Sequence, residues 1–166
     1  MRAIRSAIAA IVIAAGFILP LHIVTATPIT SAAVAAAKVA PVVSRVQTAQ
    51  QKRYSAMRFA LSKKGGWYLY GGNGPTRYDC SGLVVAAYNH VGVSLPRTTY
   101  GMLGSSKLIR IPRSQAKWGN LVFFSSGHVE MVSSAYRYAY GAHHSGTRIG
   151  YRHYYGSPTF YKVRGT

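Results

Sequence analysis

Cys80 and His128 are the residues of this sequence whose types and order could support nucleophilic catalysis. Cys80 is the only cysteine of the chain. It follows Asp79, a good helix cap, and opens an apolar pattern with helical spacing, so we expect it in the first turn of a helix. Backbone N–H groups and the helix dipole stabilise a thiolate there, and a thiolate is the attacking form of cysteine. His128 follows a Ser-Ser-Gly turn at the start of a predicted strand, where its imidazole could take the thiol proton.

Residue type alone does not decide this chemistry. A lone cysteine is more often a small buried apolar residue than a nucleophile. The adjacent pair His143 and His144 could suggest zinc, but with one cysteine the chain falls short of three or four closely spaced ligands. We therefore expect neither a metal nor another cofactor.

The charge balance excludes some function classes and favours others. The chain has 20 Lys and Arg residues against two acids, Asp79 and Glu130, and a formal net charge of +18. A glycosidase with two placed carboxylates, or a calcium or magnesium site, would need both acids at once. So basic a protein is attracted to polyanions such as nucleic acid, anionic lipid or an acidic cell wall.

The N-terminal part of the chain has the composition of an export signal. Arg2 and Arg5 precede a long apolar stretch that ends in small residues, which predicts a signal peptide over residues 1–26. An uncleaved membrane anchor is the alternative, because the stretch approaches bilayer-spanning length and could contact the membrane transiently. Residues 27–50, rich in Ala, Val and Pro, predict a flexible linker. A secreted or wall-associated protein has little access to DNA, so we expect no nucleic-acid partner.

The remaining sequence, 51–166, predicts one α+β domain. Helical spacing indicates helices over residues 55–64 and 80–91, the first ended by Gly65-Gly66. Short aromatic and β-branched runs then alternate with Gly, Ser and Pro, which is typical of an antiparallel sheet. These runs are residues 121–124, 128–132, 136–140, 147–151 and 160–163. Helices first and strands second predict an α+β architecture, which we expect to be monomeric.

Five sequence blocks of this domain resemble the NlpC-type cysteine peptidases, which are secreted bacterial endopeptidases that cut peptidoglycan stem peptides. The blocks are Tyr68-Leu69-Tyr70-Gly71-Gly72, Tyr78-Asp79-Cys80-Ser81-Gly82-Leu83-Val84, Gly92-Val93-Ser94-Leu95-Pro96-Arg97-Thr98, Gly119-Asn120-Leu121-Val122-Phe123-Phe124 and Gly127-His128-Val129. The resemblance covers roughly residues 55–166, and the combination of blocks is more specific than a single short motif.

The resemblance implies a papain-like core in which a helix-borne cysteine precedes a sheet-borne histidine. It makes Cys80 the nucleophile and His128 the base. By the same resemblance Tyr68 assists the oxyanion region, beside the backbone N–H of Cys80. Asp79 and Ser81 match positions that line the substrate groove. Each of the three also has a structural alternative: Asp79 as a helix cap, Ser81 as a first-turn residue and Tyr68 as a core residue.

The sequence departs from the family pattern at two places. Asn120 stands where relatives usually have Asp, which we expect to alter a turn and not the chemistry. Many relatives carry an orienting histidine directly before an alanine, and here Gly141 occupies that place. Residues 141 and 143 share one face of a strand, so we predict that His143 orients His128. Glu130, His144 and a backbone carbonyl remain alternatives.

The sequence therefore predicts a secreted cysteine endopeptidase that hydrolyses amide bonds in peptidoglycan stem peptides, with peptidoglycan and anionic wall polymers as its partners. It does not identify which stem-peptide bond is cut. The alternative is a cationic wall-binding protein that keeps the fold without turnover.

Overall fold

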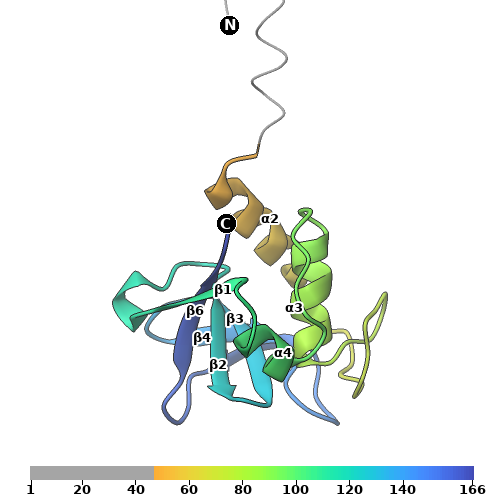
Figure 1. The fold of residues 1–166 in the computed structure, drawn as a ribbon. Coiled ribbons are helices and arrows are strands. Elements are labelled where there is room, and N and C mark those ends of the chain that lie inside the picture. The colour runs from red at the N-terminus through yellow and green to blue at the C-terminus, as the bar shows by residue number, and fades with distance from the viewer. Residues whose placement is uncertain (1–46) are drawn as a thin grey trace, which may run out of the picture. The chain divides into compact units, whose positions relative to one another are not determined.

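The computed structural model describes residues 47–166, which form an α+β domain (Figure 1). The elements in chain order are α2 (Ala49–Leu61), α3 (Cys80–Asn89), α4 (Thr99–Leu103), β1 (Leu108–Ile111), the 3₁₀ helix η1 (Arg113–Gln115), β2 (Leu121–Ser125), β3 (His128–Val132), β4 (Tyr138–Gly141), β5 (Gly150–His153) and β6 (Thr159–Val163). The α+β prediction is confirmed. The predicted signal segment and nearly all of the predicted linker lie outside the described residues, and no helix among residues 47–166 has the length and apolarity to cross a membrane.

The six strands form one antiparallel sheet with the order β1-β6-β2-β3-β4-β5. Each of the five predicted strands has a counterpart, with bounds that differ by up to three residues. Strands β3 and β4 pair with Met131 opposite Tyr140 and Val132 opposite Ala139. The same register, continued, brings residue 130 opposite residue 141, which becomes important at the site.

Helix α2 begins two residues before the predicted domain boundary at residue 51. The Thr48 side chain accepts a hydrogen bond from Gln51 N, and the Gln51 side chain accepts one from Thr48 N, which together form a capping box. The helix ends at Leu61, before the predicted end at residue 64. The next residues bond three positions back, Lys63 N to Ala60 O and Lys64 N to Leu61 O, so the last predicted turn is tighter than an α-helix.

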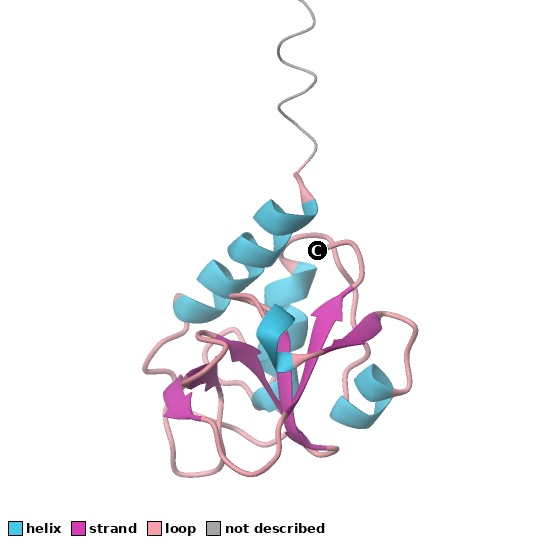
Figure 2. Ribbon diagram, turned by 90° about the vertical axis from the view of Figure 1, so that its left-hand side faces the viewer, coloured by secondary structure: helices cyan, strands magenta, loops and turns pink. Residues whose placement is uncertain are grey.

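Helices α2 and α3 lie side by side against the sheet, as both views show (Figures 1 and 2). The buried side of α3 carries Leu83, Val84, Ala87 and Tyr88, which pack in the main core with Met57 of α2. This α3 pattern was predicted from its spacing. Because α3 contacts β3, the core fixes the helix that begins with Cys80 against the strand that begins with His128.

Two short elements were not predicted. Helix α4 has five residues, too few for a periodic pattern, and it begins at the Thr98 cap. Strand β1 is at the edge of the sheet and pairs only with β6. Its sequence, Leu-Ile-Arg-Ile, lacks the flanking signals that mark the other strands.

Candidate active site

Cys80 is the first residue of α3 and is held there by the cap that precedes it. The Asp79 side chain accepts a hydrogen bond from Gly82 N at 2.6 Å, which confirms the predicted N-cap. The absence of a side chain at Gly82 is required, because a Cβ there would collide with the Gly72 carbonyl oxygen. The loop at Gly72 therefore packs directly on the first turn, and the Cys80 thiol, 8% exposed as a residue, stays at the helix start.

Asp79 also forms a two-point ion pair that the sequence did not predict. Arg97 Nη1 donates to Asp79 Oδ1 at 3.0 Å, and Nη2 donates to Oδ2 at 2.7 Å. Nη1 further donates to the Ser81 hydroxyl at 2.8 Å. Asp79 and Ser81 do line the groove as expected, but both are already engaged by Arg97. Such a pairing depends on a contact 18 residues away along the chain, so no local pattern indicates it.

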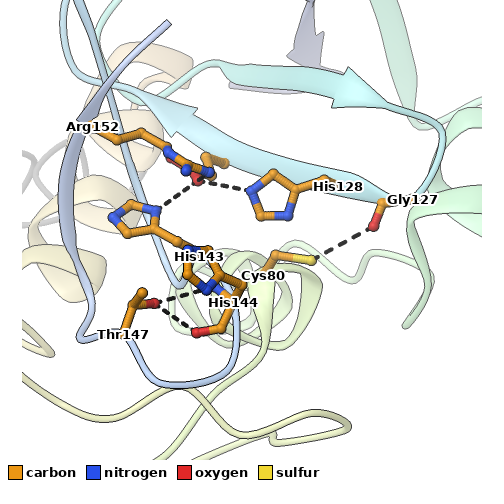
Figure 3. A network of polar contacts seen from close by, with 8 residues as sticks. Cys80, Gly127, His128, His143, His144, Thr147 and Arg152 are labelled. Atoms are coloured by element: carbon orange, nitrogen blue, oxygen red, sulfur yellow. Dashed lines mark hydrogen bonds and ion pairs between the residues drawn. The ribbon is translucent and has the colours of Figure 1, made fainter. Parts of the chain in front are cut away.

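The His128 ring lies beside the Cys80 side chain, whose thiol donates to the Gly127 carbonyl oxygen at 4.0 Å (Figure 3). The Nε2 of His128 contacts Glu130 Oε1 at 2.8 Å, so the second ring nitrogen, Nδ1, is left for the thiol. Burial lowers the pKa of His128, but hydrogen bonds and charge interactions with Cys80 and Glu130 outweigh this and raise the pKa to about 9. The imidazole is therefore a strong proton acceptor beside the only thiol.

Glu130 is fully buried and takes donors from three directions. Its Oε1 accepts from His128 and from His143, both at 2.8 Å, and from Arg152 Nη1 at 3.3 Å. Burial raises the pKa of Glu130, but the hydrogen bonds and positive charge of the two histidines lower it overall. The side chain is thus a carboxylate in the core, and its second oxygen, Oε2, has no protein partner.

The group that contacts His128 directly is therefore Glu130 and not His143. His143 Nδ1 contacts the same Glu130 oxygen, one step further from the thiol. His144 turns away, and its Nδ1 contacts the Ser145 carbonyl at 2.9 Å on the surface. Residues 128 and 130 share one face of β3 because strand side chains alternate, so a period-two reading could have found this pair.

Gly141 explains how a glutamate fits at this place. A Cβ built on Gly141 would lie 2.5 Å from Glu130 Cγ and 3.0 Å from Glu130 Cδ, both closer than side-chain carbons approach. The glycine that replaces the expected orienting histidine thus leaves the space that Glu130 occupies. Gly141 on β4 and Glu130 on β3 are therefore sterically compatible with each other.

A groove of about 550 Å³ runs past Cys80 and is lined by tyrosines and by the Arg97 network. Tyr68, predicted near the oxyanion, is one of its lining residues. Burial raises the pKa of Tyr68, and the negative charges of Cys80 and Asp79 raise it further, so the hydroxyl stays protonated and can donate. Tyr70 and Tyr100 stand at the rim, 87% and 67% exposed. Within residues 47–166 no group of three or more His, Cys, Asp or Glu is arranged to hold a metal ion.

Asn120, the other departure from the family pattern, lies away from this groove in the turn before β2. Its Oδ1 accepts from Lys117 N at 2.7 Å, and its own N–H donates to Lys117 O at 2.9 Å. The side chain is 2% exposed and its Nδ2 has no hydrogen-bond partner. Asn120 thus shapes a turn, and its amide keeps an unused donor.

Comparisons with known proteins agree with this geometry. The model of the NlpC/P60 family matches residues 65–161. A segment of 60 residues is 50% identical to the probable endopeptidase p60 of Listeria monocytogenes, and covers 36% of this chain and 12% of that protein. Another of 71 residues is 41% identical to the bifunctional muramidase/DL-endopeptidase CwlT of Bacillus subtilis, and covers 42% of this chain and 21% of that protein. The chain thus spans a small part of these relatives.

Solved structures show the same fold. The peptidoglycan hydrolase RipB of Mycobacterium tuberculosis superposes with a TM-score of 0.61 at 26% identity, over 72% of this chain and 68% of that chain. The P60 domain of a M. avium subspecies paratuberculosis antigen gives a TM-score of 0.61 at 24% identity, over 71% of this chain and 98% of that one. The papain-like fold expected from the resemblance is therefore present, and the chain belongs to the NlpC/P60 family.

Proposed function

We propose that this protein is a cysteine endopeptidase that hydrolyses amide bonds in the stem peptides of peptidoglycan. The observation that carries the proposal is the His128 ring, which interacts with Cys80 on one side and with the buried Glu130 on the other, beside an open groove. A thiol at a helix start, a base within reach and a group that orients the base are the parts that acyl transfer requires. Membership of the NlpC/P60 family, together with relatives that are endopeptidases, supports this substrate class.

The first half of the reaction forms an acyl-enzyme. His128 takes the Cys80 proton, and the thiolate attacks the carbonyl carbon, forming a C–S bond and an oxyanion. The first N–H groups of a helix have no partner within the helix. That of Gly82 is taken by the Asp79 cap, so the N–H of Cys80, together with the Tyr68 hydroxyl, can hold that oxyanion. The C–N bond then breaks as the His128 imidazolium gives its proton to the leaving amine, and a thioester remains.

The second half releases the product. Water attacks the thioester while His128 takes one water proton, the C–S bond breaks, and the new carboxylic acid leaves. Glu130 remains ionised throughout, as its lowered pKa requires, and stabilises the imidazolium each time it forms. Glu130 is thus proposed as the orienting residue, while His143 and Arg152 act on His128 only through Glu130.

The surface charge suits a site of action in an anionic wall. The chain has 20 basic residues, and the only acids, Asp79 and Glu130, are already paired with Arg97 and with the His128, His143 and Arg152 side chains. We propose that the protein is exported and that its excess positive charge holds it to wall polymers. Such binding should weaken as salt is added, because exposed charges are screened.

The decisive experiment is digestion of purified peptidoglycan, with mass analysis of the released fragments. The wild-type protein should release stem-peptide fragments. The Cys80→Ala variant lacks the thiol and should release none. Equal release by both proteins would overturn the mechanism. Wall binding by both without any fragment, together with a Cys80 that iodoacetamide fails to alkylate at neutral pH, would instead favour the wall-binding protein without turnover.

A further inference from the structure

A second cavity lies away from Cys80, between α2, the turn before β2 and the end of β6. It encloses about 430 Å³, and its lining includes three basic residues, Arg53, Lys117 and Lys162. Figure 1 shows the end of β6 close to α2, and the turned view in Figure 2 agrees. Of the described residues that line this cavity, none is acidic. The two acids of the chain are both in the active site, so the three cations gather here without an opposite charge from a side chain.

Two lining residues are buried donors whose hydrogen-bonding capacity is not filled. Arg53 is 8% exposed. Its Nε donates to the Trp118 carbonyl at 3.0 Å, and its guanidinium carbon lies 5.4 Å from the Tyr54 ring centroid. Asn120, the second, is 2% exposed and has an Nδ2 without a partner. Leaving a buried donor unpaired is unfavourable, so such a group indicates an acceptor that completes the site.

The orientation of Asn120 follows from its other contact. Because Oδ1 accepts from Lys117 N, the unpaired Nδ2 is the end of the amide that remains for a ligand. An aspartate at this place could still accept from Lys117 N, and its second oxygen would itself supply the negative charge. With Asn120, the group at this position of the cavity is a hydrogen-bond donor, whereas with aspartate it would be an acceptor.

We infer that this cavity binds a phosphate or phosphodiester anion. Its donors come from three segments far apart in the sequence, and a tetrahedral oxyanion presents acceptor oxygens in as many directions, whereas a carboxylate presents two in one plane. Thr166 also lines the cavity, but its backbone N–H and its hydroxyl both donate to Val163 O, and its α-carboxylate is negative. The groups left for the anion are therefore Arg53, Lys117, Lys162 and Asn120, whose three positive charges outnumber that carboxylate.

The site is tested by calorimetric titration of the full chain with inorganic phosphate at low ionic strength. The wild-type protein should bind one phosphate, and Asn120→Asp and Lys162→Gln should each raise Kd at least about ten-fold, as expected for the loss of one charge-assisted contact. The matched control is Lys107→Gln, which removes the same charge from an exposed residue outside the cavity. It should change Kd by less than about two-fold.

Asn120→Asp keeps the acceptor for Lys117 N, so its thermal unfolding should remain close to that of the wild type. Absence of saturable binding, or an equal loss of affinity in all three variants, would show a diffuse positive field and overturn the inference. Binding should persist in Cys80→Ala, so this result is independent of the peptidase proposal. A soluble poly(glycerol phosphate) that displaces phosphate would assign the site to a phosphodiester of a polymer, and failure to displace would assign it to free phosphate.

Discussion

The two carboxylates of this protein are used differently on the two sides of its active site. Asp79, on the helix side, has both oxygens engaged by backbone N–H, hydroxyl and guanidinium donors. Glu130, on the sheet side, concentrates three donors on Oε1 and leaves Oε2 without a protein partner. Asp79 fixes the position of Cys80, the proposed nucleophile, whereas Glu130 holds His128, the proposed base, and raises its pKa. Neutralising Asp79 and neutralising Glu130 should therefore have different effects on activity and stability.

The largest difference is expected from neutralising each acid in turn. Glu130→Gln keeps the shape but removes the charge that stabilises the His128 imidazolium, so kcat/KM should fall by roughly ten-thousand-fold, comparable to the loss of the acid in the Ser-His-Asp triad. Rates of fragment release from peptidoglycan measure this. If activity fell only a few-fold while the fold was retained, His143 or a backbone group would be the orienting partner.

The space for Glu130 can be tested from the neighbouring strand. Gly141→Ala places a Cβ 2.5 Å from the present position of Glu130 Cγ, so the carboxylate must move and activity should fall by roughly ten- to a hundred-fold. Gly150→Ala is the matched control, because Gly150 pairs with Gly141 and a Cβ there meets its nearest atom, Arg148 O, at 3.9 Å. Similar losses of activity in both variants would mean that any substitution of these paired strand residues lowers activity, and that displacement of Glu130 is not the cause.

On the helix side, Asp79→Asn should reduce stability more than chemistry. The asparagine can still cap α3, but the ion pair to Arg97 is lost, and we expect the free energy of unfolding to fall by about 1–2 kcal/mol. Because Asp79 does not contact His128, the kcat of the folded protein should stay within about three-fold of the wild type. Urea denaturation gives the first quantity and peptidoglycan digestion the second. A kcat as low as that of Glu130→Gln would remove the distinction between the two acids.

The smallest effect concerns the pH at which His128 loses its proton. NMR titration of the ring should give a midpoint near the pKa of about 9 in the wild type and a lower one in Glu130→Gln, since Glu130 raises that pKa. A pKa raised in the folded state stabilises the fold fully below the ordinary value of about 6.5 and loses this contribution as pH rises through about 9. The same rise removes the imidazolium that protonates the leaving amine. A midpoint near 6.5 in the wild type would contradict the proposed pairing.

The two sides also differ in how far the sequence could predict them. The helix cap links Asp79 to Gly82, three residues along, and helical spacing predicts the buried positions of α3, so the place of Cys80 followed from local rules. His128 is two residues from Glu130, but the other two partners come from the loop after β4 (His143) and from β5 (Arg152), and Arg97 reaches Asp79 from a loop. Such contacts depend on strand register and long-range packing, which explains why His143 was predicted at the place that Glu130 takes.

The close fit between Gly141 and Glu130 also limits the order in which the two residues could have been acquired. Glutamate can occupy its present position only when residue 141 has no side chain. A succession of single substitutions that ends in this arrangement must therefore place glycine at 141 before glutamate at 130 becomes useful. During that interval the base would have no orienting residue from either strand, unless a neighbour such as His143 served in its place. His143, which now contacts the Glu130 carboxylate, is the residue that could have oriented the base at that intermediate stage.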